Sequence, residues 1–178
     1  MASIAKGLTV AVALPLALAV GHPAVHAKAL PGGEAEQIGS CIKAASRDAL
    51  WLERTLWGLR DQEGGWIGAQ VANANGTHDL GPLQVNSWWV PKIAKAIAMS
   101  EEAVRYQLRF DPCFNVEVAR WIFLSGLAST RDYWKAIGIY HSPIGWRQRL
   151  YARSVVRHLQ RRYGPEIFRG LAQRSLRP

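Results

Sequence analysis

The strongest structural signal in the chain is a row of apolar residues between positions 42 and 59. They recur every three or four positions: Ile42, Ala45, Ala49, Leu52, Leu56 and Leu59. This spacing places them on one face of an α-helix, and the pair Gly64-Gly65 ends the pattern. The sequence therefore predicts an amphipathic helix over residues 40–63, which must bury its apolar face against other elements.

Helical signals also dominate the second half of the chain. Helices are predicted from Pro91 to Ala98, from Ser100, from Asp111-Pro112, from Ser129 to Tyr140, and from Trp146 to Tyr163. The helix that begins at Pro112 is apolar nearly all round, so it should be the buried centre. Residues 64–87 are rich in Gly and Asn, which favours a loop-rich insert or small hairpin. The expected fold class is predominantly α, with five or six helices.

The N-terminus has the pattern of a secretory signal peptide over residues 1–27. Lys6 precedes an apolar run over 8–20, and Val25-His26-Ala27 supplies small residues at the cleavage positions. The run is shorter than the roughly 20 apolar residues that cross a bilayer. We therefore expect export to the periplasm and a mature protein without a transmembrane segment.

The rest of the chain divides into three parts by composition. Residues 28–37 should form a flexible lead-in, residues 38–163 one folded domain, and residues 164–178 a basic tail. The domain contains two cysteines, Cys41 and Cys113. In an exported chain an even number of cysteines favours a disulfide, and two cysteines allow only one intramolecular pairing.

The chain is strongly basic, with 22 Lys and Arg against 13 Asp and Glu and a formal net charge of +9. Outside the cytoplasm this charge favours anionic lipid, acidic wall polymer or an acidic protein as the partner, and nucleic acid is not expected. The last predicted helix carries arginines four residues apart: Arg149, Arg153, Arg157 and Arg161. They form a basic ridge that is either a solvated face or a contact with an anionic wall or membrane.

Glu63 is the strongest candidate for acid–base chemistry. It lies four residues after Leu59, on the apolar face and at the carbonyl end of the predicted helix. Burial and the partial negative charge of the helix end both raise a carboxyl pKa, as a general acid for glycoside cleavage requires. The alternative is that the helix end frays and Glu63 turns to water.

The segment 73–87 concentrates amide side chains, with Trp66, Trp88 and Trp89 close by in sequence. Amides can bind sugar hydroxyl and acetamido groups, and aromatic faces can cover sugar rings. The alternative is that Asn, Gly and Asp merely build turns here. His78, His141 and His158 lack the spacing of metal ligands, so we expect no metal and no other cofactor.

Three motifs together resemble a known family. They are Glu63-Gly64-Gly65, the run N-A-N-G-T-H-D-L-G-P-L-Q-V-N over residues 73–86, and Ile139-Tyr140-His141-Ser142. The chain thereby resembles the lytic transglycosylases with a lysozyme-like domain, over about residues 38–156. The similarity is greatest to the small specialised members that accompany secretion, pilus and conjugation systems.

The resemblance implies a lysozyme-like α+β domain that cleaves the β-1,4 bond between N-acetylmuramic acid and N-acetylglucosamine in peptidoglycan. It implies that Glu63 is the single catalytic acid and base, that Gln84 faces the substrate and that Tyr140 lies over the carboxylate. The remaining matched residues would shape or line the cleft: Asn75, Asp79 and Asn86. The product would be a 1,6-anhydromuramyl end, formed during local wall remodelling for an envelope-spanning apparatus.

Two other functions stay open at this stage. A hydrolytic lysozyme on the same scaffold would use water in place of the muramyl C6 hydroxyl, and a peptidoglycan-binding assembly factor would have little activity. For Asp79 we favour a turn-building role with bonds to local backbone N–H groups over a second catalytic carboxylate. For His141 we favour a structural role over a second catalytic one.

Overall fold

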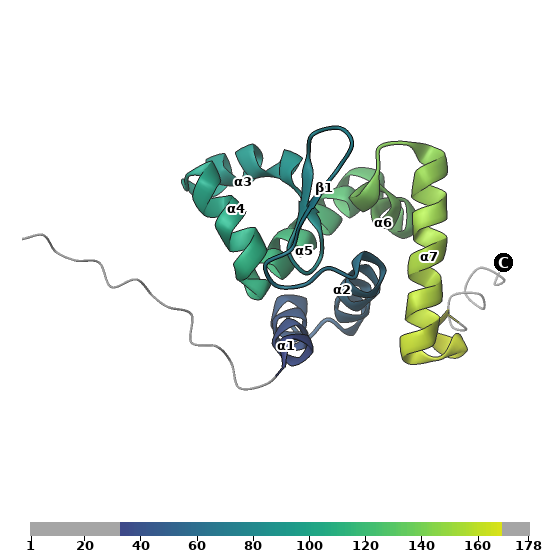
Figure 1. Cartoon of the computed structure of the whole chain (residues 1–178). Helices are drawn as coiled ribbons and strands as arrows, with labels where there is room; N and C mark the ends of the chain where they lie inside the picture. The colour runs from purple at the N-terminus through teal and green to yellow at the C-terminus, as the bar shows by residue number, and fades with distance from the viewer. Residues whose placement is uncertain (1–32, 169–178) are drawn as a thin grey trace, which may run out of the picture.

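Helix α5 (Pro112–Thr130) lies at the centre of the computed structural model, which describes residues 33–168 (Figure 1). Asp111 caps it by accepting hydrogen bonds from the backbone N–H groups of Cys113 and Phe114, and Pro112 occupies its first turn, as predicted. Many of its apolar side chains, Phe123 among them, are buried against helices on several sides, while Trp121 is 44% exposed. The predicted central helix is confirmed.

The other elements surround α5 in the described residues 33–168, with α3 and α4 on one side of the molecule and α7 on the other (Figure 1). Their bounds are α1 (Glu34–Ser46), α2 (Leu50–Glu63), β1 (Gln70–Ala72), β2 (His78–Leu80), β3 (Val85–Asn86), α3 (Val90–Ile97), α4 (Glu101–Phe110), α6 (Tyr133–His141) and α7 (Gly145–Tyr163). Single 3-10 turns cover Ser87–Trp89 and Pro165–Phe168. The predominantly α fold class is confirmed.

The predicted single helix over 40–63 is wrong, because the chain turns a corner between α1 and α2. Arg47 and Asp48 both adopt left-handed backbone angles, with φ of 50° and 62°. The predicted apolar face is nevertheless buried in both helices, because the three linking residues preserve the spacing of three and four, while Leu50 and Trp51 of α2 lie off this face and are exposed. The corner contains neither Gly nor Pro, and the apolar spacing continues across it. The sequence pattern therefore gave no sign that the helix breaks here.

The predicted flexible lead-in is also partly wrong, since α1 already begins at Glu34. Its acidic first turn, with Glu34 and Glu36, suits the positive end of the helix. The first residues of the predicted lead-in, 28–32, and the predicted signal peptide lie outside the described residues.

The segment after α2 forms a three-stranded antiparallel sheet, more than the small hairpin expected. The strand order is β1-β2-β3, with Val71 opposite Asp79 and Asp79 opposite Asn86. Gly81 follows β2 with φ of 68°, and a Cβ atom there would lie 2.0 Å from the Leu108 carbonyl oxygen. Only glycine fits this close approach of the loop to α4.

The C-terminal elements start at other residues than predicted. Helix α6 begins after Asp132, whose side chain caps the N–H of Lys135, while Ser129 still belongs to α5. The first residues of the predicted tail over 164–178 pack against the domain. The ring centroids of Phe168 and Trp134 are 5.6 Å apart. Residues 169–178 lie outside the described part.

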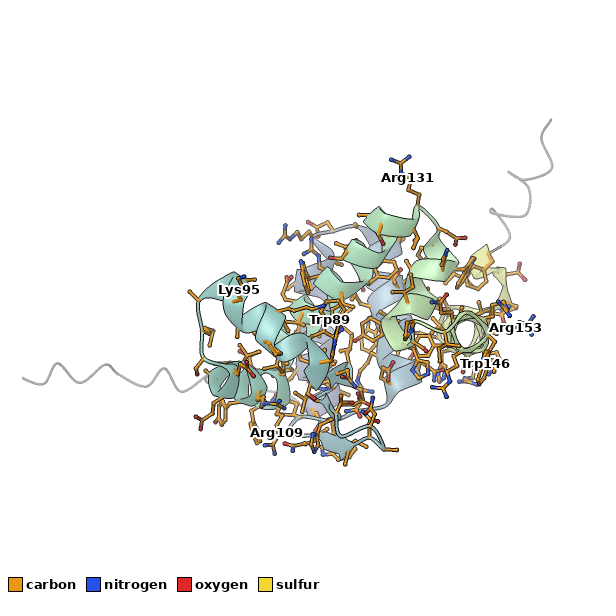
Figure 2. All side chains as sticks on the ribbon, turned by 90° about the horizontal axis from the view of Figure 1, so that it is seen from above. Trp89, Lys95, Arg109, Arg131, Trp146 and Arg153 are labelled. Atoms are coloured by element: carbon orange, nitrogen blue, oxygen red, sulfur yellow. A yellow bond between two sulfur atoms is a disulfide. The ribbon has the colours of Figure 1, made fainter. Side chains whose placement is uncertain are left out.

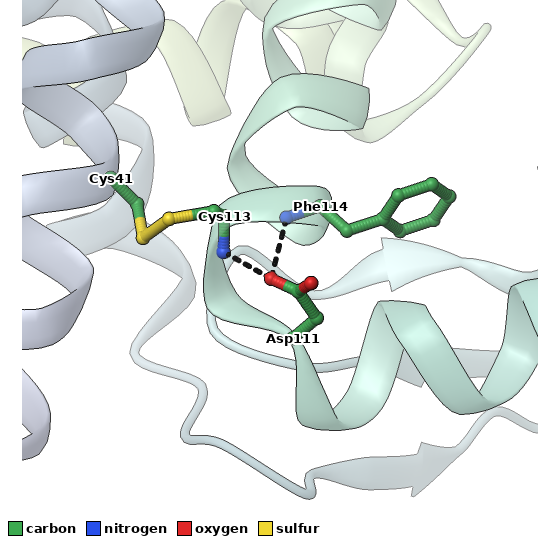
Figure 3. Close-up of a disulfide and its surroundings, with 4 residues drawn as sticks. All are labelled: Cys41, Asp111, Cys113 and Phe114. Atoms are coloured by element: carbon green, nitrogen blue, oxygen red, sulfur yellow. Dashed lines mark hydrogen bonds between the residues drawn. A yellow bond between two sulfur atoms is a disulfide. The ribbon is translucent and has the colours of Figure 1, made fainter. Parts of the chain in front are cut away.

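The predicted disulfide between Cys41 and Cys113 is present and ties α1 to the first turn of α5 (Figure 3). The two Cα atoms are 4.7 Å apart, and Asp111 caps the helix next to the bond. Such a bond persists in an oxidising compartment, which fits an exported protein. No helix within residues 33–168 is long and apolar enough to cross a membrane.

Candidate active site

A cleft of about 800 Å³ runs between the small sheet and the α6–α7 connection. All six residues predicted to act on or shape the substrate site line it: Glu63, Asn75, Asp79, Gln84, Asn86 and Tyr140. They come from α2, the β1–β2 turn, β2, β3 with the residue before it, and α6. The fold therefore gathers in one cleft residues that are up to 77 positions apart in sequence.

Glu63 is the last residue of α2, and Gly64 ends the helix in the left-handed conformation with φ of 63°. Burial raises the pKa of the Glu63 carboxyl to about 7, a hydrogen bond from Tyr151 opposes this shift, and the charge of Asp79 adds to it. Near neutral pH the carboxyl is therefore present in both its acid and its base form. The interpretation in which Glu63 turns to water is wrong.

Tyr151 of α7 is the functional residue that sequence reasoning missed. Its hydroxyl donates to Oε1 of Glu63, and its side chain is 6% exposed. Burial and the neighbouring Glu63 carboxyl raise the pKa of the Tyr151 hydroxyl well above its usual value, so it remains a donor. One signal in the sequence could have found it: Tyr151 lies on the face of α7 that carries the apolar residues. A buried hydroxyl needs a hydrogen-bond partner, so a polar group was to be expected next to it.

His141 lies against the other side of this pair. Its ring stacks on that of Tyr151, with 4.7 Å between centroids and an angle of 4° between planes. Partial burial lowers the pKa of His141, Asp79 raises it, and Arg147 lowers it. The contact supports the preference for a structural role. In this role the His141 ring packs against Tyr151, the residue that binds Glu63.

Tyr140 lines the cleft but does not form a hydrogen bond with Glu63. Its hydroxyl donates to the Leu83 carbonyl oxygen at 2.8 Å, which ties α6 to the loop before β3. Burial and the nearby carboxyl groups of Glu63 and Asp79 raise the pKa of Tyr140 well above its usual value. Of the two tyrosines beside the carboxyl, Tyr151 is thus the one that holds it.

Gln84 is fixed in an unusual backbone conformation, with φ of 48°. Its Nε2 atom donates to the Gly81 carbonyl oxygen at 2.8 Å. Gly65 packs so closely that a Cβ atom there would lie 2.6 Å from the same Nε2. The glycine after the α2 cap therefore lets the Glu63 segment and the Gln84 side chain approach each other.

The amide side chains of Asn75 and Asn86 form hydrogen bonds with neighbouring hydroxyl and carboxylate groups. Asn86 donates to Oδ1 of Asp79 at 2.8 Å and to the Thr77 hydroxyl at 2.9 Å. The Thr77 hydroxyl in turn donates to Oδ1 of Asn75 at 2.8 Å. These contacts give Asn75 and Asn86 a role in shaping the cleft.

The expected turn-building role of Asp79 is wrong, because the residue lies in β2. Its carboxylate accepts from the Asn86 side chain instead of from local backbone N–H groups. The strand periodicity was too short to reveal this, since β2 has three residues and β3 only two.

Aromatic side chains line one end of the cleft. Trp88 and Trp89 contact each other edge to face, with centroids 4.9 Å apart, and Lys92 Nζ lies 3.3 Å from the Trp88 ring centroid. Trp66 is exposed but is not among the described residues that line the cleft. The aromatic surface next to the amides is thus provided by two tryptophans, not three.

The site has the parts for proton transfer to and from a molecule bound in the cleft. Glu63 carries a transferable proton. The Tyr151 hydroxyl donates to its Oε1 atom, and no hydrogen bond to its Oε2 atom is found among residues 33–168. In the same part of the chain no group of three His, Cys, Asp or Glu side chains is placed to hold a metal ion. No protein-family model and no curated protein sequence matches the chain.

Proposed function

We propose that the protein is a peptidoglycan lytic transglycosylase. It would cleave the β-1,4 bond between N-acetylmuramic acid and N-acetylglucosamine and leave a 1,6-anhydromuramyl end. The observation that carries the proposal is the carboxyl of Glu63, with a pKa of about 7, inside a cleft bordered by amides and two tryptophans. The sequence resemblance of three separate motifs that converge on this cleft adds support.

The proposed reaction uses Glu63 twice. Oε2 first gives its proton to the glycosidic oxygen, and the bond from that oxygen to the muramyl C1 breaks. The acetamido carbonyl of the substrate stabilises the cationic C1 centre, so a second protein carboxylate is not needed. The muramyl C6 oxygen then bonds to C1, and its proton passes to the Glu63 carboxylate, which restores the acid.

Tyr151 serves both halves of this cycle. Its hydroxyl stabilises the carboxylate after the first proton transfer, because a hydrogen bond to the charged form favours that form. It also fixes the carboxyl plane, which leaves Oε2 for the substrate. Asp79 is engaged by Asn86, which supports a mechanism with one catalytic carboxyl.

We place the activity in the periplasm, as local wall remodelling for an envelope-spanning secretion, pilus or conjugation apparatus. The apolar run over 8–20 and the disulfide support export. The glycan strands of the wall, which are the proposed substrate, also lie outside the cytoplasm.

Product analysis on purified cell walls tests the proposal. The parent protein should release muropeptides that are lighter by one water than hydrolysed ones and that borohydride does not reduce. Glu63→Gln should abolish release, since it removes the transferable proton. Glu53→Gln, the same change on α2 outside the cleft, should leave activity unchanged.

Each other outcome points to one alternative. Reducible muramic acid ends would identify a hydrolytic lysozyme, and Asp79, the other carboxylate among the described lining residues, would then be tested as Asp79→Asn. Wall binding without any released product, from both parent and Glu63→Gln, would identify an assembly factor.

A further inference from the structure

The outward face of α7 combines exposed apolar side chains with arginines. Trp146 and Leu150 are 54% and 55% exposed, and they lie one helical turn apart near the start of the helix. The same face continues with exposed arginines at helical spacing: Arg149, Arg153, Arg157 and Arg161. Figure 2 shows Trp146 and Arg153 on this side of the molecule, away from Lys95.

The two faces of α7 are occupied differently. Tyr151, Val155 and Leu159 are buried toward the core, and Arg162 forms an ion pair with Asp61 at 2.6 Å. Helix α7 contains no acidic residue. Among the described residues the outward arginines form no ion pair, and Arg161 contacts the His158 ring nitrogen at 2.8 Å. Within residues 33–168 the outward face of α7 is therefore a cationic surface whose arginines have no carboxylate partner.

A shallow hollow lies at the C-terminal end of this face. Arg157, Gln160, Arg161 and Pro165 line it, and it encloses about 370 Å³. Two guanidinium groups and an amide offer several N–H donors to one anion, an arrangement that suits phosphate oxygens.

We infer that the outward face of α7 docks on an anionic phospholipid surface. Trp146 and Leu150 enter the headgroup boundary together with exposed Ile144, and the arginines bind lipid phosphates. An acidic polymer would contact only the charges, whereas a bilayer also accepts the three exposed apolar side chains that lie together at one end of this basic helix. The inference is independent of the reaction proposed for the cleft.

Docking in this way also orients the cleft. Pro143 and Arg147 line the cleft, and they flank Ile144 and Trp146 in sequence. A bilayer in contact with the start of α7 would therefore lie beside these lining residues of the cleft. This consequence, unlike the docking itself, rests on the proposed function: the cleft would then meet glycan that lies close to the membrane.

Vesicle binding at low and moderate salt tests the inference. The mature protein, without the predicted signal peptide over residues 1–27, is compared with Arg153→Glu/Arg157→Glu, with Trp146→Ala/Leu150→Ala and with the control Lys95→Glu/Arg105→Glu. The control makes the same change in net charge at exposed positions of α3 and α4. All four proteins begin at residue 28, so the apolar N-terminal run cannot bind the vesicles in place of α7.

On vesicles with 30% phosphatidylglycerol, the arginine variant should bind at least ~10-fold more weakly at low salt, with a smaller loss at higher salt. The tryptophan–leucine variant should bind ~10-fold more weakly at both salt concentrations. The Lys95/Arg105 control should bind within about two-fold of the parent. Thermal unfolding at unchanged temperature shows that each variant is folded.

Four results would overturn the inference. Equal weakening by the control would mean that bulk charge alone drives binding. A loss only in the arginine variant would mean that any polyanion suffices. Equal binding of parent and variants, or equal binding to neutral phosphatidylcholine vesicles, would exclude the face as an anionic lipid contact.

Discussion

The Glu63 carboxyl is held between two opposing influences. Burial and Asp79 favour the protonated form, while the Tyr151 hydroxyl favours the ionised form. The net pKa of about 7 lies where one group can give a proton and later take one back. The same balance predicts how stability and activity respond to pH.

Glu63→Gln should stabilise the protein in a pH-dependent way. Below pH 4.5 the carboxyl is protonated in both folded and unfolded states, so its ionisation affects neither. Between pH 4.5 and about 7 the unfolded chain releases this proton while the folded parent retains it, so the parent loses up to about 3 kcal/mol of stability as the pH rises to the folded pKa. Urea unfolding measures the free energy of unfolding of the variant minus that of the parent. This difference should be larger at pH 8 than at pH 4 by roughly the same amount. A difference that does not change with pH would contradict the burial argument.

Tyr151→Phe should move the high-pH limb of wall cleavage to higher pH. Loss of the hydroxyl removes the hydrogen bond that lowers the pKa of Glu63, so the acid form persists further into the alkaline range. The pH profile of the initial rate of wall turbidity loss measures the shift. An unchanged limb with a lower rate at every pH would show that Tyr151 acts only through packing.

At the scale of elements, Asn115 joins α5 to the loop that carries Gln84. It is fully buried, its Nδ2 donates to the carbonyl oxygens of Leu80 and Leu108, and its Oδ1 accepts from the N–H of Leu83. One side chain thus satisfies three backbone groups from three segments. The position of the loop depends on this amide rather than on strand pairing alone.

Asn115→Leu should lower the free energy of unfolding by about 3–5 kcal/mol, because it leaves three buried backbone groups unpaired. Asn75→Leu in the exposed β1–β2 turn, the matched change, should cost less than about 1 kcal/mol. Denaturant unfolding compares the two. A similar small loss at both positions would mean that water reaches the Leu80–Leu83 loop.

At the scale of the whole molecule, the sequence predicted the features that depend on local chemistry. The helix starts at Ser100 and Asp111 and the disulfide follow from capping and cysteine count, and the structure contains them. The corner at Arg47 escaped because no local signal marks it. Tyr151 escaped because its partner Glu63 is 88 residues away, and only the packing of α7 against α2 brings them together.

The turn between β1 and β2 borders the cleft and lies outside the hydrophobic core. It spans residues 73–77, its own hydrogen bonds close it, and three of its polar side chains line the cleft. Added length here would cost little in chain entropy and would leave the core contacts intact. On the proposed function, libraries that vary this turn should change which wall glycans are cleaved, while Glu63 on α2 and Tyr151 on α7 stay in place.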